Sequence, residues 1–303
     1  MNSNKGVNWQ VTFKNLPEIP NSKRWTSDFS TTLEQVIIKK IINKSFINEE
    51  ETFILLELIN FYNELYERLE SLDYESFNNE DLKNFKYYIY YAFSYVALMT
   101  SKYTIFKTYR MVLNENIIGK NERIKHIKNL KHPSLDVVKK INKYNRSNTP
   151  ESSIFYSCED IDTALKELKP PKNKLVTIGV WMPKKNRTFE TYVVFYSDST
   201  SKVNPDAYNA FSAFEKDFSK YPPIFKEFMA SYYKLLGREY SKTVNHHYEY
   251  LISSLFSERI IEGASNFNVN YDCIMYPSVQ NNYITRNFAI KSSIVDSDFY
   301  LER

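Results

Sequence analysis

Hydrophobic residues in the N-terminal third of the chain recur at three- and four-residue spacings, as the apolar face of a helix requires. The first such stretch begins at Thr31 and includes Leu33, Val36, Ile37 and Ile41. A second stretch has the same periodicity, and Asn79, Glu80 and Asp81 suit the start of a third helix. We therefore predict three helices, over residues 31–42, 50–72 and 79–100. The polar, aperiodic residues 1–30 predict an extended arm in front of them.

The pattern changes at Tyr103, where hydrophobic and polar residues begin to alternate and β-forming side chains become common. Helices and strands are intermixed from here on without a strict strand–helix–strand rhythm, so the fold class is α+β and not doubly wound. We expect a helical lead-in over 1–102 and a mixed sheet flanked by helices over 103–303. The predicted strands are 103–113, 153–157, 174–181, 191–196, 272–276 and 287–291, and the predicted helices are 161–168, 208–218, 224–236 and 245–261.

Composition limits the class of protein. Hydrophobic residues make up 43% of the chain and charged residues 25%, as in folded globular domains. A net charge of +4 gives weak attraction to polyanions and argues against a dedicated nucleic-acid binder. The apolar run between Lys86 and Lys102 is too short and too rich in tyrosine to span a bilayer. With no secretion signal and two distant cysteines, Cys158 and Cys273, we expect a cytoplasmic protein without a membrane partner.

Several kinds of site are excluded by missing motifs. The five glycines are isolated, so neither a dinucleotide-binding GxGxxG turn nor a phosphate-binding P-loop is present. The four histidines form no HExxH motif and have no cysteine partners nearby, so we expect no metal site. A GxSxG nucleophile elbow is absent as well.

Four clusters of chemically capable residues remain. They are Tyr109–Arg110, Asn145–Asn148 with Tyr156, Thr163–Pro170, and Tyr271–Val279 with Asn287. Their order and type resemble the RES domain family of bacterial NAD-degrading enzymes, many of them toxins of toxin–antitoxin pairs. The resemblance spans roughly residues 103–299, and its matching positions are Arg110, Arg146, Asn148, Tyr156, Thr163, Ala164, Glu167, Asp272, Ile274, Tyr276, Ser278 and Asn287.

The resemblance implies a fold related to ADP-ribosyltransferases and an enzyme that takes NAD as its substrate without a metal. Such an enzyme releases nicotinamide, with water or phosphate as acceptor, as a glycohydrolase or a phosphorylase. An antitoxin protein would be its partner. Two positions depart from the family pattern, because Asn145 and Cys273 stand where the family has glycine. Asparagine still tolerates a positive φ, whereas a side chain at Cys273 limits close approach of the backbone to a ligand.

Arginine and tyrosine suit the charged parts of NAD. Guanidinium groups bind phosphate oxygens in a two-pronged fork, which makes Arg110 and Arg146 the candidates for the pyrophosphate. An ordinary surface ion pair is the alternative for either arginine. The cationic nicotinamide ring can stack on a tyrosine, for which Tyr156 is the first choice and Tyr109 the second. A role in the core is the alternative for both.

Glu167 is the candidate catalytic carboxylate, with Arg110 beside it in the predicted catalytic set. Cleavage of the bond between nicotinamide and ribose builds positive charge on the sugar, which a nearby carboxylate stabilises. A solvated glutamate paired with Lys166 or Lys169 is the alternative. We expect Ser278, Asn287 and, by the resemblance, Asn148 to bind other parts of the substrate.

Two other readings stay open. Residues 119–143 carry many lysines and few acids, and a basic module that contacts nucleic-acid phosphates would use such a segment. A RES-like scaffold without catalysis is the third reading, and the departure at Cys273 is its support.

Overall fold

The computed structural model describes residues 33–92, 101–195, 202–261 and 270–302. The predicted arm over 1–30 and the end of the third predicted helix lie outside these residues. Two compact units make up the chain: Met1–Ala97 with Glu215–Leu235, and Leu98–Phe214 with Leu236–Arg303. The predicted boundary at residue 102 lies near the first of these divisions, but the helical segment 215–235 was not expected in the N-terminal unit.

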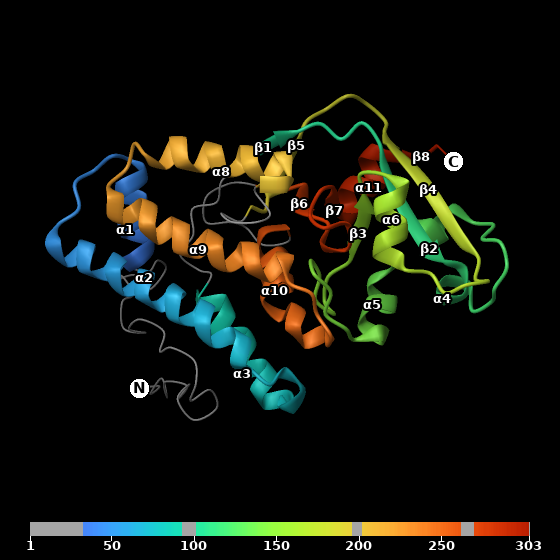
Figure 1. The fold of residues 1–303 in the computed structure, drawn as a ribbon, viewed down its shortest axis with the longest axis horizontal. Helices are drawn as coiled ribbons and strands as arrows, with labels where there is room; N and C mark the ends of the chain where they lie inside the picture. The colour runs from blue at the N-terminus through green and yellow to red at the C-terminus, as the bar shows by residue number, and fades with distance from the viewer. Residues whose placement is uncertain (1–32, 93–100, 196–201, 262–269, 303) are drawn as a thin grey trace, which may run out of the picture. The chain divides into compact units, whose positions relative to one another are not determined.

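Helices form the described part of the first unit (Figure 1). They are α1 (Leu33–Ile42), α2 (Glu49–Arg68) and α3 (Asn79–Ala92), with the short 3₁₀ turns η1 (Leu69–Ser71) and η2 (Tyr74–Ser76), joined by residues 215–235 from the helices α8 (Pro205–Phe218) and α9 (Pro223–Ser241). Asn48 caps α2 by accepting the N–H of Glu51, and the Glu51 carboxylate accepts the N–H of Asn48 in return. The fully buried Tyr62 packs its ring 5.8 Å from Phe228 and 5.4 Å from Tyr232. Aromatic packing therefore joins α2 to the segment 215–235.

An eight-stranded mixed sheet forms the second unit, in the order β1-β5-β6-β7-β3-β2-β4-β8. Only β5 and β6 run parallel among the described pairs. The strands are β1 (Ser101–Tyr103), β2 (Thr108–Leu113), β3 (Ile154–Cys158), β4 (Val176–Pro183), β5 (Phe189–Val193), β6 (Cys273–Pro277), β7 (Arg286–Lys291) and β8 (Phe299–Leu301). The expected α+β class with a mixed sheet is confirmed.

Helices and short 3₁₀ turns connect these strands. They are α4 (Asn114–Ile118), η3 (Ile127–Leu130), α5 (Leu135–Ile141), α6 (Ile161–Leu168), η4 (His247–Tyr250), α10 (Leu251–Ile261), η5 (Val279–Asn281) and α11 (Ser292–Asp298). None of the helices in the described ranges is long and apolar enough to cross a membrane.

Two predicted elements are interrupted. The expected strand over 103–113 forms only from residue 108 on, as β2, while Tyr103 ends β1. The two strands have different partners, because β1 pairs with β5 and β2 pairs with β3 and β4. The expected helix over 245–261 begins as η4, because His246 accepts the N–H of Tyr248 at its start and the regular helix follows only from Leu251. The short elements α4, α5, α11 and β8 were not predicted, since they are too brief to show a periodicity.

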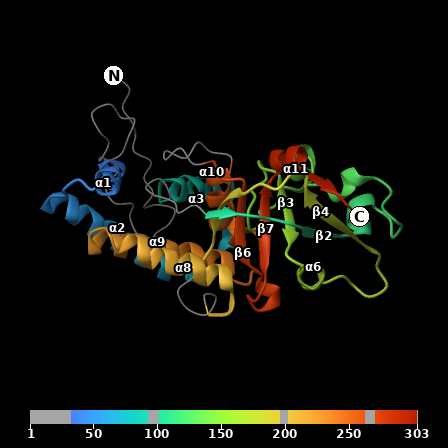
Figure 2. The same cartoon turned by 90° about the horizontal axis from the view of Figure 1, so that it is seen from above.

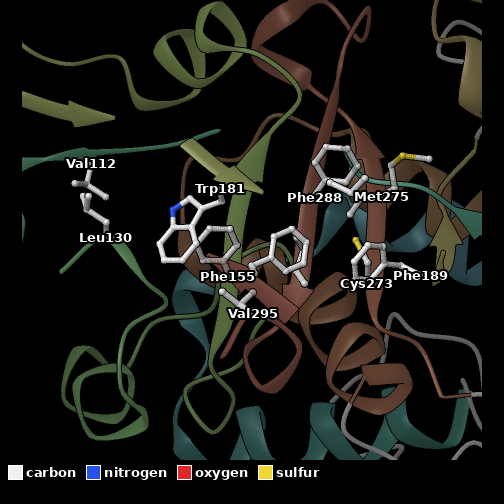
Figure 3. Packing of buried hydrophobic residues seen from close by; sticks show 12 residues of the cluster. Val112, Leu130, Phe155, Trp181, Phe189, Cys273, Met275, Phe288 and Val295 are labelled. Atoms are coloured by element: carbon white, nitrogen blue, oxygen red, sulfur yellow. The ribbon is translucent and has the colours of Figure 1, made fainter. Parts of the chain in front are cut away.

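One face of the sheet carries a hydrophobic core (Figure 3). Phe155 and the fully buried Trp181 meet edge to face, with their ring centroids 5.3 Å apart. Cys273 belongs to this core as well. The indole of Trp181 also lies over Gly179, where a Cβ atom would come within 2.8 Å of its Nε1. The core therefore requires glycine at this position.

Strand direction brings several chain segments to one end of the sheet. β3 and β6 both run antiparallel to β7, which lies between them, so β3 and β6 end on the same side. The helix α6 follows β3 there, and Ser278 follows β6. Figure 2 shows α6 and α11 at opposite ends of these strands. Segments separated by more than a hundred residues thus meet beside α6.

Candidate functional site

The carboxylate of Glu167 lies at the centre of a hydrogen-bonded cluster at this end of the sheet. Its Oε1 atom accepts the hydroxyl proton of Ser278 at 2.6 Å and an amide proton of Asn287 at 2.7 Å. No donor to Oε2 is found among the described residues, and the side chain is half-buried. One oxygen of the carboxylate is therefore fixed by the protein, while the other remains for a ligand.

Local sequence explains why Glu167 faces the sheet. Asp160 caps α6 by accepting the N–H of Thr163 at 2.7 Å, and the helix has the predicted bounds, Ile161–Leu168. Thr163 and Ala164 are its buried residues. Because residues three and four positions apart share a helix face, Glu167 lies on the buried face of α6.

Ser278 is oriented by its own turn. Its oxygen accepts the N–H of Asn281 at 3.2 Å, so its proton is left for the carboxylate. Asn287 stands in β7 directly between Cys158 of β3 and Tyr276 of β6. Both donors are buried, and their positions are fixed by the turn and by the sheet.

Further polar contacts join α6 to the turn that follows Ser278. The Thr163 and Thr285 hydroxyl oxygens are 2.7 Å apart, and the amide of Asn281 donates to Thr285 at 2.7 Å. The ammonium group of Lys166 donates to the amide oxygen of Asn281. Sequence reasoning did not place Lys166, Asn281 or Thr285 in the site, because nothing in the local pattern marks them.

Tyr156 and Asn148 are bonded to each other. The Tyr156 hydroxyl donates to Oδ1 of Asn148 at 2.9 Å and accepts the N–H of Ser147 at 2.8 Å. The amide nitrogen of Asn148 donates to the Thr149 carbonyl. Asn145 is not among the described residues with a positive φ, so the turn does not use the conformation that glycine would favour. The predicted Tyr156 and Asn148 thus brace this turn.

Tyr276 stands opposite Asn287 in the sheet, and Arg146 lies 6.0 Å from its ring centroid, although Tyr276 was not among the predicted site residues. Burial raises the pKa of its phenol well above the ordinary value, and Tyr156 and Glu167 raise it further, while Arg146 opposes the shift. The signal in the sequence that could have identified Tyr276 was its place in the Tyr271–Val279 motif.

Arg146 forms hydrogen bonds with carbonyl groups at the end of a helix. Its Nη2 donates to the Lys242 carbonyl at 3.1 Å, and its Nη1 donates to the carbonyls of Glu239 and Tyr240. These carbonyls belong to the C-terminal end of α9, where a cation is favoured. The guanidinium also lies 5.0 Å from the ring centroid of Tyr250. The group predicted to bind pyrophosphate therefore already has protein partners.

Arg110 lies on the other face of the sheet. Side chains alternate along a strand, and Val112, two residues on, belongs to the core that contains Phe155. The guanidinium of Arg110 lies 5.4 Å from the Phe155 ring centroid and donates to the Tyr156 carbonyl at 2.9 Å. Burial lowers its pKa to about 10. It thus touches the backbone of Tyr156 and stays apart from the Glu167 cluster.

The positions of Tyr109 and Cys273, the last two residues discussed in the sequence analysis, are set by the sheet. Tyr109 pairs with Cys158, so its side chain faces the same side as that of Asn287. Cys273, at the position where the resemblance leads one to expect glycine, belongs to the hydrophobic core, on the face away from Tyr276. It therefore does not intrude on Glu167.

Eight predicted site residues thus fall into three groups. Direct bonds join Glu167, Ser278 and Asn287. Tyr156, Asn148 and Arg146 form a second group at the turn 145–148, and Tyr109 and Arg110 lie on β2 with Arg110 turned to the core. No group of His, Cys, Asp and Glu suited to a metal ion occurs in the described part of the chain. Comparison of the chain with family models, with curated proteins and with solved structures gave no match.

Proposed function

We propose that this chain binds NAD and cleaves the bond between nicotinamide and ribose, as a glycohydrolase or a phosphorylase. The observation that carries the proposal is the carboxylate of Glu167, whose Oε1 atom is held by Ser278 and Asn287. Its other oxygen has no donor among the residues described. A carboxylate fixed in this way is preorganised to act on a sugar that becomes cationic.

The reaction needs no oxidant, reductant or further cofactor. The bond between the nicotinamide nitrogen and the ribose carbon breaks, and its electron pair stays on the nitrogen, which leaves as neutral nicotinamide. Positive charge develops on the ribose, and the negatively charged Glu167 carboxylate stabilises it through its Oε2 atom. Water or phosphate then bonds to the ribose carbon, and a water nucleophile loses its proton to solvent.

Tyr156 suits the nicotinamide end of the substrate. The Tyr156 hydroxyl is occupied by Asn148 and Ser147, and the side chain is only partly buried. A cationic ring is attracted to the face of a phenol. Arg110 supports the strand that carries Tyr156, through its bond to the Tyr156 carbonyl.

Nicotinamide release tests the proposal. Purified full-length protein is incubated with NAD, with and without phosphate, and free nicotinamide is measured by chromatography. We expect release by the wild type and a loss of at least about a hundredfold in Glu167→Gln. Absence of release under both conditions would overturn the proposal. Binding of NAD without cleavage would instead identify a scaffold that has lost catalysis.

A toxin-type role in the bacterial cytoplasm, with an antitoxin as partner, follows as part of the same proposal. Induced expression in bacteria should then arrest growth and deplete NAD. The arrest should disappear in Glu167→Gln at equal protein level. Growth arrest that persists in this variant would argue against NAD consumption as its cause.

A further inference from the structure

The phosphates of a dinucleotide need a cation that the two predicted arginines do not supply. Both terminal nitrogens of Arg146 donate hydrogen bonds to carbonyl groups of α9 and of Lys242. Arg110 lies among core side chains on the opposite face of the sheet. A cation that binds the phosphates would therefore come from another residue close to Glu167, one whose hydrogen-bond donors are not all used by the protein.

Lys166 meets this requirement. It precedes Glu167 on α6, and its ammonium group donates to the amide oxygen of Asn281. No carboxylate within ion-pair distance of Lys166 is found in the described residues, so its charge is not neutralised there. An ammonium group has three donors, and a single bond to Asn281 leaves two for a ligand.

The contact with Asn281 also ties Lys166 to the carboxylate. The backbone N–H of Asn281 donates to Ser278, which in turn donates to Glu167. A short chain of hydrogen bonds therefore connects the ammonium group of Lys166 to the carboxylate of Glu167. Opposite charges fixed in this way suit a ligand with an anionic group beside a sugar that becomes cationic.

Asn281 is itself immobilised, which makes its partner an ordered cation. Its amide nitrogen donates to Thr285 at 2.7 Å and contacts Thr163 at 3.4 Å, and its side chain is buried. A lysine anchored to such a group loses less side-chain entropy when it binds a ligand than a freely moving lysine would.

We infer that Lys166 binds a phosphate group of the substrate, while Glu167 acts on the ribose beside it. This inference rests on the proposed function, and it makes the phosphate a determinant of substrate choice. Substrates that carry ribose and nicotinamide but no pyrophosphate gain nothing from Lys166. The lysine that sequence reasoning paired with Glu167 thus contacts the substrate instead.

The test compares ligands with and without pyrophosphate. ADP-ribose binding is measured by calorimetry for the wild type, Lys166→Gln and the control Lys169→Gln. Both lysines are exposed, and Lys169 directly follows α6. We expect Lys166→Gln to weaken ADP-ribose binding about tenfold, as loss of one charge-assisted hydrogen bond would. Lys169→Gln should bind like the wild type. If nicotinamide riboside, which lacks pyrophosphate, is turned over, Lys166→Gln should lower its turnover by a smaller factor than that of NAD, whereas Lys169→Gln should leave the ratio of the two rates as in the wild type.

The outcomes separate this inference from the proposed function. Equal ADP-ribose affinity in Lys166→Gln and the wild type overturns the phosphate role, even if NAD cleavage proceeds. An equal loss in Lys169→Gln overturns it too, because a general charge effect would then explain the result. Lys166-dependent binding of ADP-ribose without nicotinamide release would support the phosphate site and reject the activity. A wild type that neither binds nor cleaves rejects both.

Discussion

Ser278 donates its hydroxyl proton to Oε1 of Glu167 at 2.6 Å, although 111 residues separate them in the chain. The same oxygen of Ser278 accepts the N–H of Asn281, so its proton has a fixed direction. We predict that Ser278→Ala lowers kcat for NAD cleavage roughly tenfold to a hundredfold, since it removes a hydrogen bond to a charged group. Steady-state kinetics measure this effect. Retention of full activity would show that the carboxylate does not need this donor.

Glu167→Gln should abolish nicotinamide release without changing the unfolding midpoint. Glutamine has the same shape and can still accept from Ser278 and Asn287, but it carries no charge to stabilise a cationic ribose. The matched control is Asp162→Asn, which removes an exposed carboxylate from the first turn of the same helix. A comparable loss of activity in the control would mean that the overall charge of α6, and not this carboxylate, matters.

Arg146→Ala should destabilise the fold, because the side chain binds carbonyls at the C-terminal end of α9. We expect a loss of about 1.5–3 kcal/mol in the free energy of unfolding, the usual range for hydrogen bonds that involve a charged group. Urea unfolding monitored by circular dichroism measures it. Arg123→Ala, at an exposed position, should cost little by comparison. If both variants unfold alike, the contacts of Arg146 do not stabilise the helix end.

Gly179→Ala should destabilise the protein by about 1–3 kcal/mol through overpacking. A Cβ atom there would lie 2.8 Å from Nε1 of Trp181 and 3.1 Å from Cδ1 of Leu301. The buried indole has little room to move. A smaller ring in Trp181→Phe should therefore lower the added cost of the alanine in the double variant, as a double-mutant cycle would reveal. Additive costs would indicate that the two positions are not in steric conflict.

The protein should become less stable in acid, because protonation of Asp296 removes its charge interactions with Lys131 and His132. Burial raises the pKa of Asp296, but bonds from Lys131 at 2.8 Å and from His132 at 3.2 Å outweigh it and hold the pKa below its ordinary value. A depressed folded-state pKa gives stability that is present above the unfolded value, about 3.9, and is lost as the pH falls through the folded value.

Asp296→Asn should thus unfold at a lower temperature than the wild type at pH 7, and the difference should shrink toward pH 3. The effect is small, because Asp296 is half exposed and solvent screens the pair. Asp136→Asn, at an exposed position in α5, serves as the control. A difference between Asp296→Asn and the wild type that does not vary with pH would exclude this charge pair as its source.

Local signals sufficed for several elements. The start of α6 could be predicted because Asp160 and Asp162 are both suitable capping residues, and Asp160 is the one that caps the helix. The strand β7 could be predicted because hydrophobic and polar residues alternate along it. Such elements carry their own pattern within a few residues. The short α11 and β8 carry no such pattern and depend on tertiary contacts.

The candidate site could be predicted only in part. The resemblance singled out Glu167, Ser278 and Asn287 one by one, but their contact depends on β6 and β3 flanking β7. Alternation along a strand was the overlooked signal for Arg110, since it and Tyr109 must point to opposite faces. No local pattern could reveal that Arg146 would bind the end of α9, because that contact joins distant segments.

The division of the chain into two units has a consequence for fragments of this protein. Residues 215–235 belong with the N-terminal helices, so a fragment that starts near residue 98 keeps Phe228 and Tyr232 but loses Tyr62, which packs against both. Aromatic surface that is buried in the intact protein would then meet water and favour aggregation. Excision of the sheet domain would accordingly require replacement of 215–235 by a short polar linker, in addition to removal of the N-terminus.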